Sequence, residues 1–255
     1  MKRIIRLAAM AATITFVSMF PGTGAYAQTA IQNVVIVHGA LADGSGWRQV
    51  HDILKQKGFR VTVVQPPQTS LQEDVTATKR ILDLQDGPSL LVGHSYGGMV
   101  VTEAGTAANV AGLVYIAAFQ PDNGENLLDL ADRIAPATTG IKATADGFLY
   151  LDPAVFAADF AADIPAAEAE FMANSQVFPA KIAFEARITE AAWKNRRSWA
   201  LIPRDDRAIN PELMRQMAAR AGSETVEVAG SHAVFMSQPA AVADVIEKAA
   251  KALSR

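Results

Sequence analysis

Cysteine is absent from this 255-residue sequence, and histidine occurs only four times. Without cysteine the chain can form no disulfide and no thiolate metal site, and it has no cysteine nucleophile. Because the four histidines are scattered, a zinc cluster is not expected, and a mechanism that needs an imidazole has few candidates. The sequence therefore predicts neither a bound metal ion nor an organic cofactor.

Charged residues are also scarce, at 19% of the chain, and the formal net charge is only -3. No block of lysine and arginine occurs after the first few residues, so we expect neither a nucleic-acid partner nor attraction to an anionic membrane surface. Half of the residues are hydrophobic, which is enough for a sizeable core and argues against disorder. No pattern in the sequence specifies an oligomeric state.

The first 27 residues have the three parts of a secretory signal peptide. Residues 1–6 are basic, residues 7–20 form an uncharged apolar run, and Ala25-Tyr26-Ala27 is a small-x-small cleavage signature. The apolar run is too short to span a bilayer comfortably, so we expect no stable membrane anchor. The pattern predicts cleavage after Ala27, export to the periplasm or out of the cell, and a mature single domain over residues 28–255.

Strand patterns alternate with helix patterns through most of the remaining chain. Short apolar runs typical of buried strands occur at 33–37, 61–64, 90–92, 110–119, 198–202 and 225–228. This alternation predicts an α/β domain with a mostly parallel sheet flanked by helices. The rhythm stops between about residues 121 and 195, which are alanine-rich, punctuated by prolines and without a strand pattern. We interpret this stretch as a helical cap inserted over the carboxyl edge of the sheet.

The stretch over residues 90–101, LLVGHSYGGMVV, carries Gly-x-Ser-x-Gly between a strand pattern and a helix pattern. In that context Ser95 must lie on a tight, strained turn that projects its hydroxyl, and Gly93 and Gly97 leave room for the turn. The start of the helix adds backbone N–H groups and a partial positive charge beside the serine. Ser95 is therefore the predicted nucleophile, and the alternative is a serine in an ordinary glycine-rich turn.

A serine hydroxyl needs an imidazole to accept its proton. In this architecture the base comes last in the chain, and His232 is the only histidine after Ser95. His232 lies on a loop of small residues after a short strand pattern, so it is the predicted base. Of the other histidines, His51 is expected on a helix surface and His94 is expected to pack within the turn around Ser95. His38 is expected to prop the loop after the first strand.

The imidazole in turn needs a carboxylate that fixes its tautomer and stabilises its cation. Asp205 and Asp206 both follow the strand pattern at 198–202, and Asp206 is the favoured acid. Asp205 is expected to face solvent or Arg204, with an Asx-type turn as its alternative role. Asp122 follows the preceding strand and is the competing acid.

The oxyanion that develops during acyl transfer needs preorganised donors. The backbone N–H of Tyr96, the residue after the nucleophile, is one candidate, and the N–H of Ala40, in the loop after the first strand, is the other. An apolar substrate pocket is expected nearby. Its candidate wall residues are Leu41, Phe119 and Trp193.

Four segments together resemble a known family: HGALADGSGW at 38–47, GHSYGG at 93–98, DDRAI at 205–209 and GSHAVFMSQP at 230–239. They are similar to the α/β-hydrolase fold and, within it, to the methylesterase and hydroxynitrile lyase group of plants and its bacterial relatives. The resemblance implies a triad of Ser95, Asp206 and His232. It also implies the N–H groups of Ala40 and Tyr96 as the oxyanion donors.

Two positions separate esterase from lyase within that resemblance. Hydroxynitrile lyases of the group carry a hydroxyl residue where Gly39 stands and a lysine after the catalytic histidine, where this chain has Ala233. Ala233 cannot stabilise a departing cyanide, so the expected activity is serine esterase chemistry on a small-molecule ester of small to medium size. The alternatives are cyanohydrin cleavage, amidase or perhydrolase activity on the same triad, or a binding protein with slow turnover.

Overall fold

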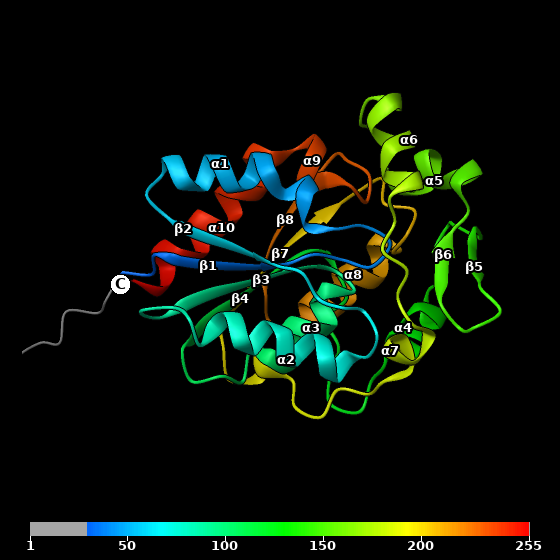
Figure 1. Cartoon of the computed structure of the whole chain (residues 1–255). Helices are drawn as coiled ribbons and strands as arrows, with labels where there is room; N and C mark the ends of the chain where they lie inside the picture. Colours follow the sequence, from blue (N-terminus) through cyan, green and yellow to red (C-terminus); the bar gives the residue numbers. More distant parts are fainter. Residues whose placement is uncertain (1–29, 255) are drawn as a thin grey trace, which may run out of the picture.

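The structure is a computed structural model that describes residues 30–254 (Figure 1). The predicted signal peptide and its cleavage site lie outside the described residues. All pairings in the central six-stranded sheet are parallel, in the order β2-β1-β3-β4-β7-β8, which confirms the predicted fold class. The strands are β1 (Asn33–Val37), β2 (Arg60–Val64), β3 (Ser89–Ser95), β4 (Val110–Ala118), β7 (Ser198–Pro203) and β8 (Glu224–Val228).

Helices cover both faces of this sheet (Figure 1). On one side α1 (Arg48–Gln56) packs against α10 (Pro239–Leu253), and on the other α2 (Leu71–Leu82) packs against α3 (Gly97–Ala104). Further helical segments around the sheet are the short turn η1 (Gly44–Trp47), α8 (Pro211–Ala221) and α9 (Val234–Ser237). Side chains of Ser70 and Asn210 cap α2 and α8, as polar residues do at helix starts.

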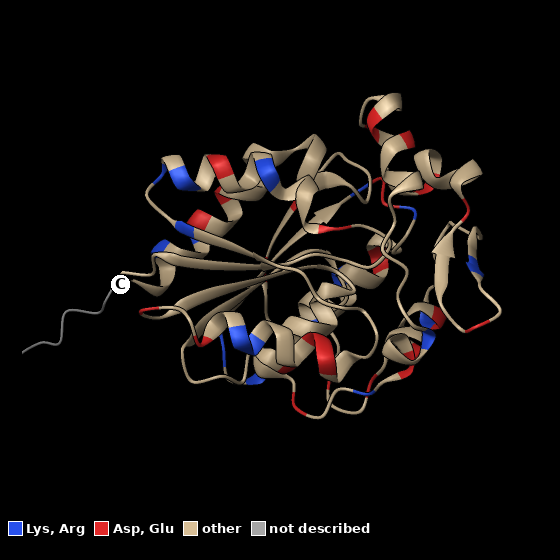
Figure 2. Cartoon of the chain, viewed as in Figure 1, with Lys and Arg blue, Asp and Glu red and all other residues tan. Residues whose placement is uncertain are grey.

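The core lies between the sheet and these helices. Every residue of β1 and β3 is buried, because these strands are covered on both faces, and that is why they are continuous rather than alternating apolar runs. Fully burying one such valine or leucine side chain contributes about 1.5–3 kcal/mol. Charges of both signs are interspersed along the helices and loops, with few on the central strands (Figure 2).

The cap follows β4 and lies at the carboxyl edge of the sheet, on the right of Figure 1. Its helices are α4 (Leu127–Arg133), α5 (Pro153–Phe160), α6 (Ala166–Asn174), α7 (Lys181–Glu185) and the short turn η2 (Ala192–Lys194). Beside these helices, β5 (Ile141–Ala143) and β6 (Leu149–Leu151) form an antiparallel hairpin that the prediction of a helical cap did not include. Each strand has only three residues, and every residue of β5 is exposed, so the sequence shows no alternation of apolar and polar residues there.

The order of the strands brings two loops together at the carboxyl edge. Strand β1 pairs with β2 on one side and with β3 on the other, so the order in which successive strands join the parallel sheet reverses between β1 and β3. Ligands of open α/β sheets bind where the strand order reverses in this way. The loop after β1 and the turn after β3 therefore lie side by side, beneath the cap.

None of the helices in residues 30–254 has the length and apolarity of a membrane span.

Candidate active site

The turn between β3 and α3 holds Ser95 in a left-handed backbone conformation, with φ of 53°. A residue with a Cβ atom rarely adopts this backbone conformation, so the turn is strained, as the motif predicts. The two glycines after it allow close backbone approach. A Cβ on Gly97 would lie 2.5 Å from the carbonyl oxygen of Val37, and one on Gly98 would lie 2.0 Å from that of Phe119.

The structure brings the three predicted triad side chains together. The Ser95 hydroxyl donates to Nε2 of His232 at 2.8 Å, and Nδ1–H of His232 donates to Oδ2 of Asp206 at 2.7 Å. The other carboxylate oxygen of Asp206 accepts the backbone N–H groups of Ala208 and Ile209. His232 and Asp206 are both buried, so these bonds form out of contact with bulk water. The chain of bonds fixes the tautomer in which Nε2 can accept the serine proton.

The competing acid lies elsewhere. The carboxylate of Asp122 pairs with Nζ of Lys194 at 2.5 Å. Burial acts to raise the pKa of Asp122, but the hydrogen bonds from Lys194 and from the backbone N–H of Asn123, together with the nearby positive charges, outweigh it and leave the pKa below its usual value. Asp205 is exposed, as expected, and accepts the backbone N–H of Gly230. Of the three candidate acids, only Asp206 contacts the imidazole.

His94 packs behind His232 and is not among the residues that line the cavity at Ser95. Its Nε2–H donates to the backbone carbonyl of His232 at 3.0 Å, and its ring contacts the rings of Phe235 and His232. Complete burial, reinforced by repulsion from a charged His232, holds the pKa of His94 well below its usual value. His94 is therefore a neutral support for the loop that carries His232.

The cap also holds that loop, which the sequence did not reveal. The carboxylate of Asp163 accepts both the hydroxyl and the backbone N–H of Ser231, at 2.5 and 3.0 Å. The backbone N–H of Ala233 donates to the carbonyl of Phe160, and the Phe160 ring lies edge-on to His232 with centroids 4.7 Å apart. Phe160 at the end of α5 and Asp163 just after it thus hold the residues on both sides of His232 in place.

The peptide group between Gly39 and Ala40 is held from its carbonyl side. The Gly39 oxygen accepts Nε2–H of Gln68 at 3.0 Å and Nδ1–H of His38 at 2.8 Å. Since the described chain contains no cis peptide bond, the N–H of Ala40 points away from that oxygen. His38 therefore props the loop after β1, as expected.

The peptide group between Ser95 and Tyr96 is held in the same way, because the Ser95 oxygen accepts the backbone N–H of Phe119 at 3.2 Å. Within residues 30–254, neither the N–H of Ala40 nor that of Tyr96 donates to a protein acceptor. Both residues line the cavity that contains Ser95. This arrangement offers two N–H groups to a substrate oxygen.

That cavity is apolar and small, at about 130 Å³. It lies between the sheet edge and the cap, and its walls include Leu41 and Phe119 from the predicted set. Trp193 is not among the wall residues, since its indole donates to the carbonyl of Pro121 beside the Arg220 guanidinium. The cap contributes Leu127, Leu128, Ala131, Pro136, Thr138, Ile141, Leu149, Leu151, Phe160 and Phe184.

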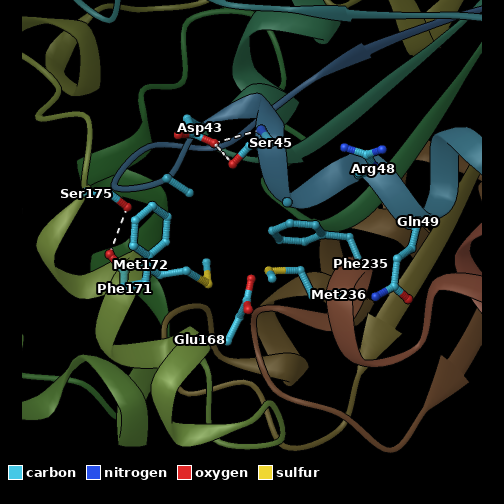
Figure 3. A pocket seen from close by; sticks show the side chains of 12 residues that line it. Asp43, Ser45, Arg48, Gln49, Glu168, Phe171, Met172, Ser175, Phe235 and Met236 are labelled. Atoms are coloured by element: carbon cyan, nitrogen blue, oxygen red, sulfur yellow. Dashed lines mark hydrogen bonds between the residues drawn. The ribbon is translucent and has the colours of Figure 1, made fainter.

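A second cavity, of about 200 Å³, opens between η1, α6 and α9 (Figure 3). In Figure 3 the carboxylate of Glu168 points into it between the thioethers of Met172 and Met236. No triad residue lines this cavity. Its wall residue Phe235 also contacts His94, so packed rings separate this cavity from the imidazole of His232. Within residues 30–254 no group of three or more His, Asp or Glu side chains is placed to hold a metal ion.

Sequence reasoning also missed Asp74, which is fully buried on α2. One of its oxygens accepts the Tyr96 hydroxyl at 2.5 Å and the other accepts the backbone N–H of Gln68 at 2.7 Å. Burial raises the pKa of Asp74 to about 6, although both hydrogen bonds act to lower it. A signal was present, because Asp74 falls on the apolar face of the helix with Leu71, Val75, Thr78 and Leu82.

Residues 34–245 match the sequence profile of the alpha/beta hydrolase family. A carbendazim hydrolyzing esterase from Nocardioides sp. (strain SG-4G) is 34% identical over 120 residues, which cover 41% of this chain and 49% of that protein. The match thus spans about half the length of this relative.

Solved structures share the fold over most of the chain. A pyrethroid hydrolase from Sphingobium faniae JZ-2 superposes with a TM-score of 0.74 at 20% identity, covering 87% of this chain and 98% of that one. A methylesterase from Arabidopsis superposes with a TM-score of 0.74 at 17% identity, covering 87% and 99%. Polyneuridine aldehyde esterase has a TM-score of 0.73 at 16% identity, covering 86% and 98%.

Proposed function

The chain belongs to the alpha/beta hydrolase family, and from that premise we propose that it hydrolyses small to medium carboxylic esters through an acyl-enzyme on Ser95. The observation that carries the proposal is the unbroken series of hydrogen bonds from Ser95 through His232 to Asp206. The esterase names of the relatives above agree with it.

The first half of the reaction forms the acyl-enzyme. Oγ of Ser95 attacks the ester carbonyl carbon while Nε2 of His232 takes the hydroxyl proton. Asp206 stabilises the imidazolium, and the N–H groups of Ala40 and Tyr96 donate to the oxyanion of the tetrahedral intermediate. His232 then gives its proton to the alcohol oxygen as the ester C–O bond breaks.

The second half repeats these roles with water. His232 accepts a proton from water, whose oxygen attacks the acyl carbon and forms a second tetrahedral intermediate. The same two N–H groups stabilise its oxyanion. When this intermediate collapses, the bond to Oγ of Ser95 breaks and His232 returns the proton to the serine. The products are a carboxylic acid and free enzyme.

The cavity supports an uncharged, compact substrate. Its volume of about 130 Å³ is close to that of an engineered cavity of roughly 150 Å³ that binds benzene. No lysine or arginine lines it, so a phosphate or polycarboxylate group would enter without a counter-charge. We infer acyl groups about as large as butyryl or benzoyl.

Cyanohydrin cleavage is disfavoured by the surroundings of the base. Ala233 is fully buried and offers only a methyl group next to His232, and no lysine or arginine of residues 30–254 lines the cavity. A departing cyanide would therefore gain no stabilising charge. Efficient cleavage of mandelonitrile without any ester turnover would reverse this ranking.

The test follows release of p-nitrophenol from acetate, butyrate, octanoate and benzoate esters. Wild-type protein is compared with Ser95→Ala and His232→Ala, and with His51→Ala as a matched control on the surface of α1. Loss of at least about a thousandfold in kcat for the first two variants, with His51→Ala unchanged, is expected. Turnover that survives Ser95→Ala would contradict the mechanism.

We also propose that the mature protein is exported after removal of residues 1–27. The support is the sequence pattern at residues 1–27, which ends in Ala25-Tyr26-Ala27. Fractionation of cells that express the full chain should recover it outside the cytoplasm with Gln28 as its first residue. An intact Met1 terminus on the active protein would oppose the proposal.

A further inference from the structure

Both candidate oxyanion donors are connected to one buried carboxylate outside the triad. Asp74 accepts the hydroxyl of Tyr96, whose own N–H is one donor. It also accepts the backbone N–H of Gln68, whose side chain binds the peptide group that carries the other donor, Ala40. We propose that Asp74 is a positioning residue that holds the two donor N–H groups of the oxyanion hole, those of Ala40 and Tyr96, in place relative to each other. This proposal rests on the proposed function and deepens it.

The first connection runs through the Tyr96 side chain. Tyr96 is 1% exposed, and its ring packs against Phe184 of the cap. The bond from its hydroxyl to Asp74 is short, at 2.5 Å, as expected when a carboxylate accepts from O–H. With the ring fixed at its outer end, the backbone at the start of α3 has less freedom to tilt. The direction of the Tyr96 N–H is thereby restrained from the side chain as well as from the Ser95 carbonyl.

The second connection runs through a strained turn. Gln68 has φ of 59°, a left-handed conformation that a non-glycine residue adopts only when its surroundings hold it there. The carboxylate of Asp74 binds its N–H and the backbone N–H of Ala180 in the cap binds its carbonyl. This conformation delivers the fully buried side-chain amide to the Gly39 oxygen at 3.0 Å.

Hydrogen bonds to the Gly39 oxygen act on the Ala40 N–H in two ways. They fix the plane of the peptide group, and they polarise it so that the N–H becomes a better donor. A preorganised donor contributes to catalysis only if it already points at the position of the oxyanion. Asp74 thus acts on the reaction without touching substrate, through one side chain and one turn.

The position of Asp74 makes a role in stability alone a poor explanation. Its folded-state pKa of about 6 lies above the ordinary value of 3.8, so ionisation of this carboxyl opposes folding. The neutral form would therefore support folding better above pH 6. A neutral side chain of the same shape that still accepts a hydrogen bond would therefore serve the core of α2 at least as well as the carboxylate does.

The test compares Asp74→Asn, Gln68→Asn and Tyr96→Phe with wild type at pH 8. Asparagine tolerates the left-handed backbone at residue 68, but its side chain is one methylene too short to reach Gly39. The matched control is Thr78→Val, which removes a buried hydrogen bond one turn along α2 without contacting either donor. Each protein is measured for kcat and KM on p-nitrophenyl butyrate and for melting temperature. Affinity for a trifluoromethyl ketone of the same chain length is measured by calorimetry.

The ketone forms a tetrahedral oxyanion on Ser95 and so reports on the donors directly. Asp74→Asn and Gln68→Asn are expected to lower kcat about tenfold with little change in KM. They should weaken ketone binding by the same factor, without a lower melting temperature for Asp74→Asn. Thr78→Val should leave kcat and ketone affinity unchanged. If Asp74→Asn does not fold, Gln68→Asn and Tyr96→Phe carry the same comparison.

Ketone affinity equal to wild type in Asp74→Asn, Gln68→Asn and Tyr96→Phe would overturn the proposal. So would a fall in kcat that follows only the loss of folded protein. Because calorimetry needs no turnover, failure of the wild-type protein to cleave any ester would count against the proposed function instead. The two failures are therefore distinguishable.

Discussion

At the scale of single residues, the site depends on where side chains are missing as much as on where they are present. Ser95 can reach His232 only because the turn around it is tight, and the turn is tight because glycine backbones pass within contact distance of neighbouring carbonyl groups. The clearest example is Gly98, which faces the carbonyl of Phe119. Phe119 in turn donates its N–H to the Ser95 oxygen.

Gly98→Ala is therefore expected to damage both stability and catalysis. A Cβ would lie 2.0 Å from the Phe119 oxygen, so the backbone of α3 or of β4 must move. We expect a loss of about 1–3 kcal/mol in the free energy of unfolding, with a fall in kcat beyond that loss. Urea denaturation and steady-state kinetics measure the two effects. Gly87→Ala is the control, since its Cβ would meet nothing closer than 3.7 Å, and equal behaviour of the two variants would contradict the argument.

A second prediction at this scale separates the two candidate acids. Asp206→Asn leaves the packing almost unchanged but favours the wrong tautomer of His232, so kcat should fall by about 10³–10⁴. Asp122→Asn removes a partly exposed ion pair with Lys194 and should keep kcat within about threefold of wild type. Kinetics of the two variants on one ester decide between them. A larger loss from Asp122→Asn would move the acid to that position.

At the scale of elements, the cap contacts the loops that carry Asp206 and His232 as well as covering the cavity. Asp159 of α5 pairs with Arg207, the residue after Asp206, and Asp163 binds Ser231, the residue before His232. One short segment of the cap thus touches the loops of both the acid and the base. The sequence marks this segment only as alanine-rich and punctuated by prolines, because contacts between distant parts of a chain leave no periodic signal.

The base of the cap is fastened to α8 by an ion pair that depends on pH. Glu125 receives two bonds from the Arg220 guanidinium and one from Arg133. Burial acts to raise the pKa of Glu125, yet these bonds, the charge of Arg220 and a hydrogen bond from the backbone N–H of Asp122 together lower it from 4.5 to about 2. Because the folded-state pKa is the lower one, the pair stabilises the fold above pH 4.5, and this stability is lost as the pH falls toward 2.

Glu125→Gln should accordingly reduce the free energy of unfolding by about 1 kcal/mol at pH 7, and by less than half of that at pH 3. Urea denaturation at the two pH values measures the difference, with Glu170→Gln on the exposed face of α6 as the control. A penalty of the same size at both values would show that the pair does not depend on the charge of Glu125.

Local patterns explain how much of this molecule could be predicted from sequence. The parallel sheet follows from continuous apolar runs, and the elbow from Gly-x-Ser-x-Gly in a strand-to-helix setting. Asp74 and Asp163 were missed because their partners lie far away in the chain, at Tyr96 and Ser231. Trp193 was expected in the pocket because aromatic residues of a cap often line a pocket. Its indole N–H instead donates to the backbone carbonyl of Pro121.

At the scale of the whole molecule, the substrate cavity exists only because two layers meet. The sheet edge supplies Ser95, His232 and the two donor peptides, and the cap supplies most of the apolar wall. Neither layer would exclude water alone. The cap therefore sets most of the size of the cavity, whereas the loops after the strands supply Ser95, His232 and the two donor peptides.

Enlarging the cap side of the cavity should change substrate preference without changing the mechanism. Leu127→Ala shortens a wall residue of α4 and is expected to raise the ratio of kcat/KM for octanoate to that for butyrate about tenfold. Leu84→Ala, at a side chain that is 75% exposed, is the control. An unchanged ratio in Leu127→Ala would show that the acyl group binds elsewhere.

The most direct test of the account is to trap the acyl-enzyme. Excess enzyme is mixed with p-nitrophenyl butyrate, quenched in acid before deacylation, and analysed by intact mass and peptide mapping. The account predicts one butyryl group per molecule, located on Ser95, and no adduct in Ser95→Ala. An adduct on another residue, or full p-nitrophenol release from Ser95→Ala, would contradict Ser95 as the nucleophile.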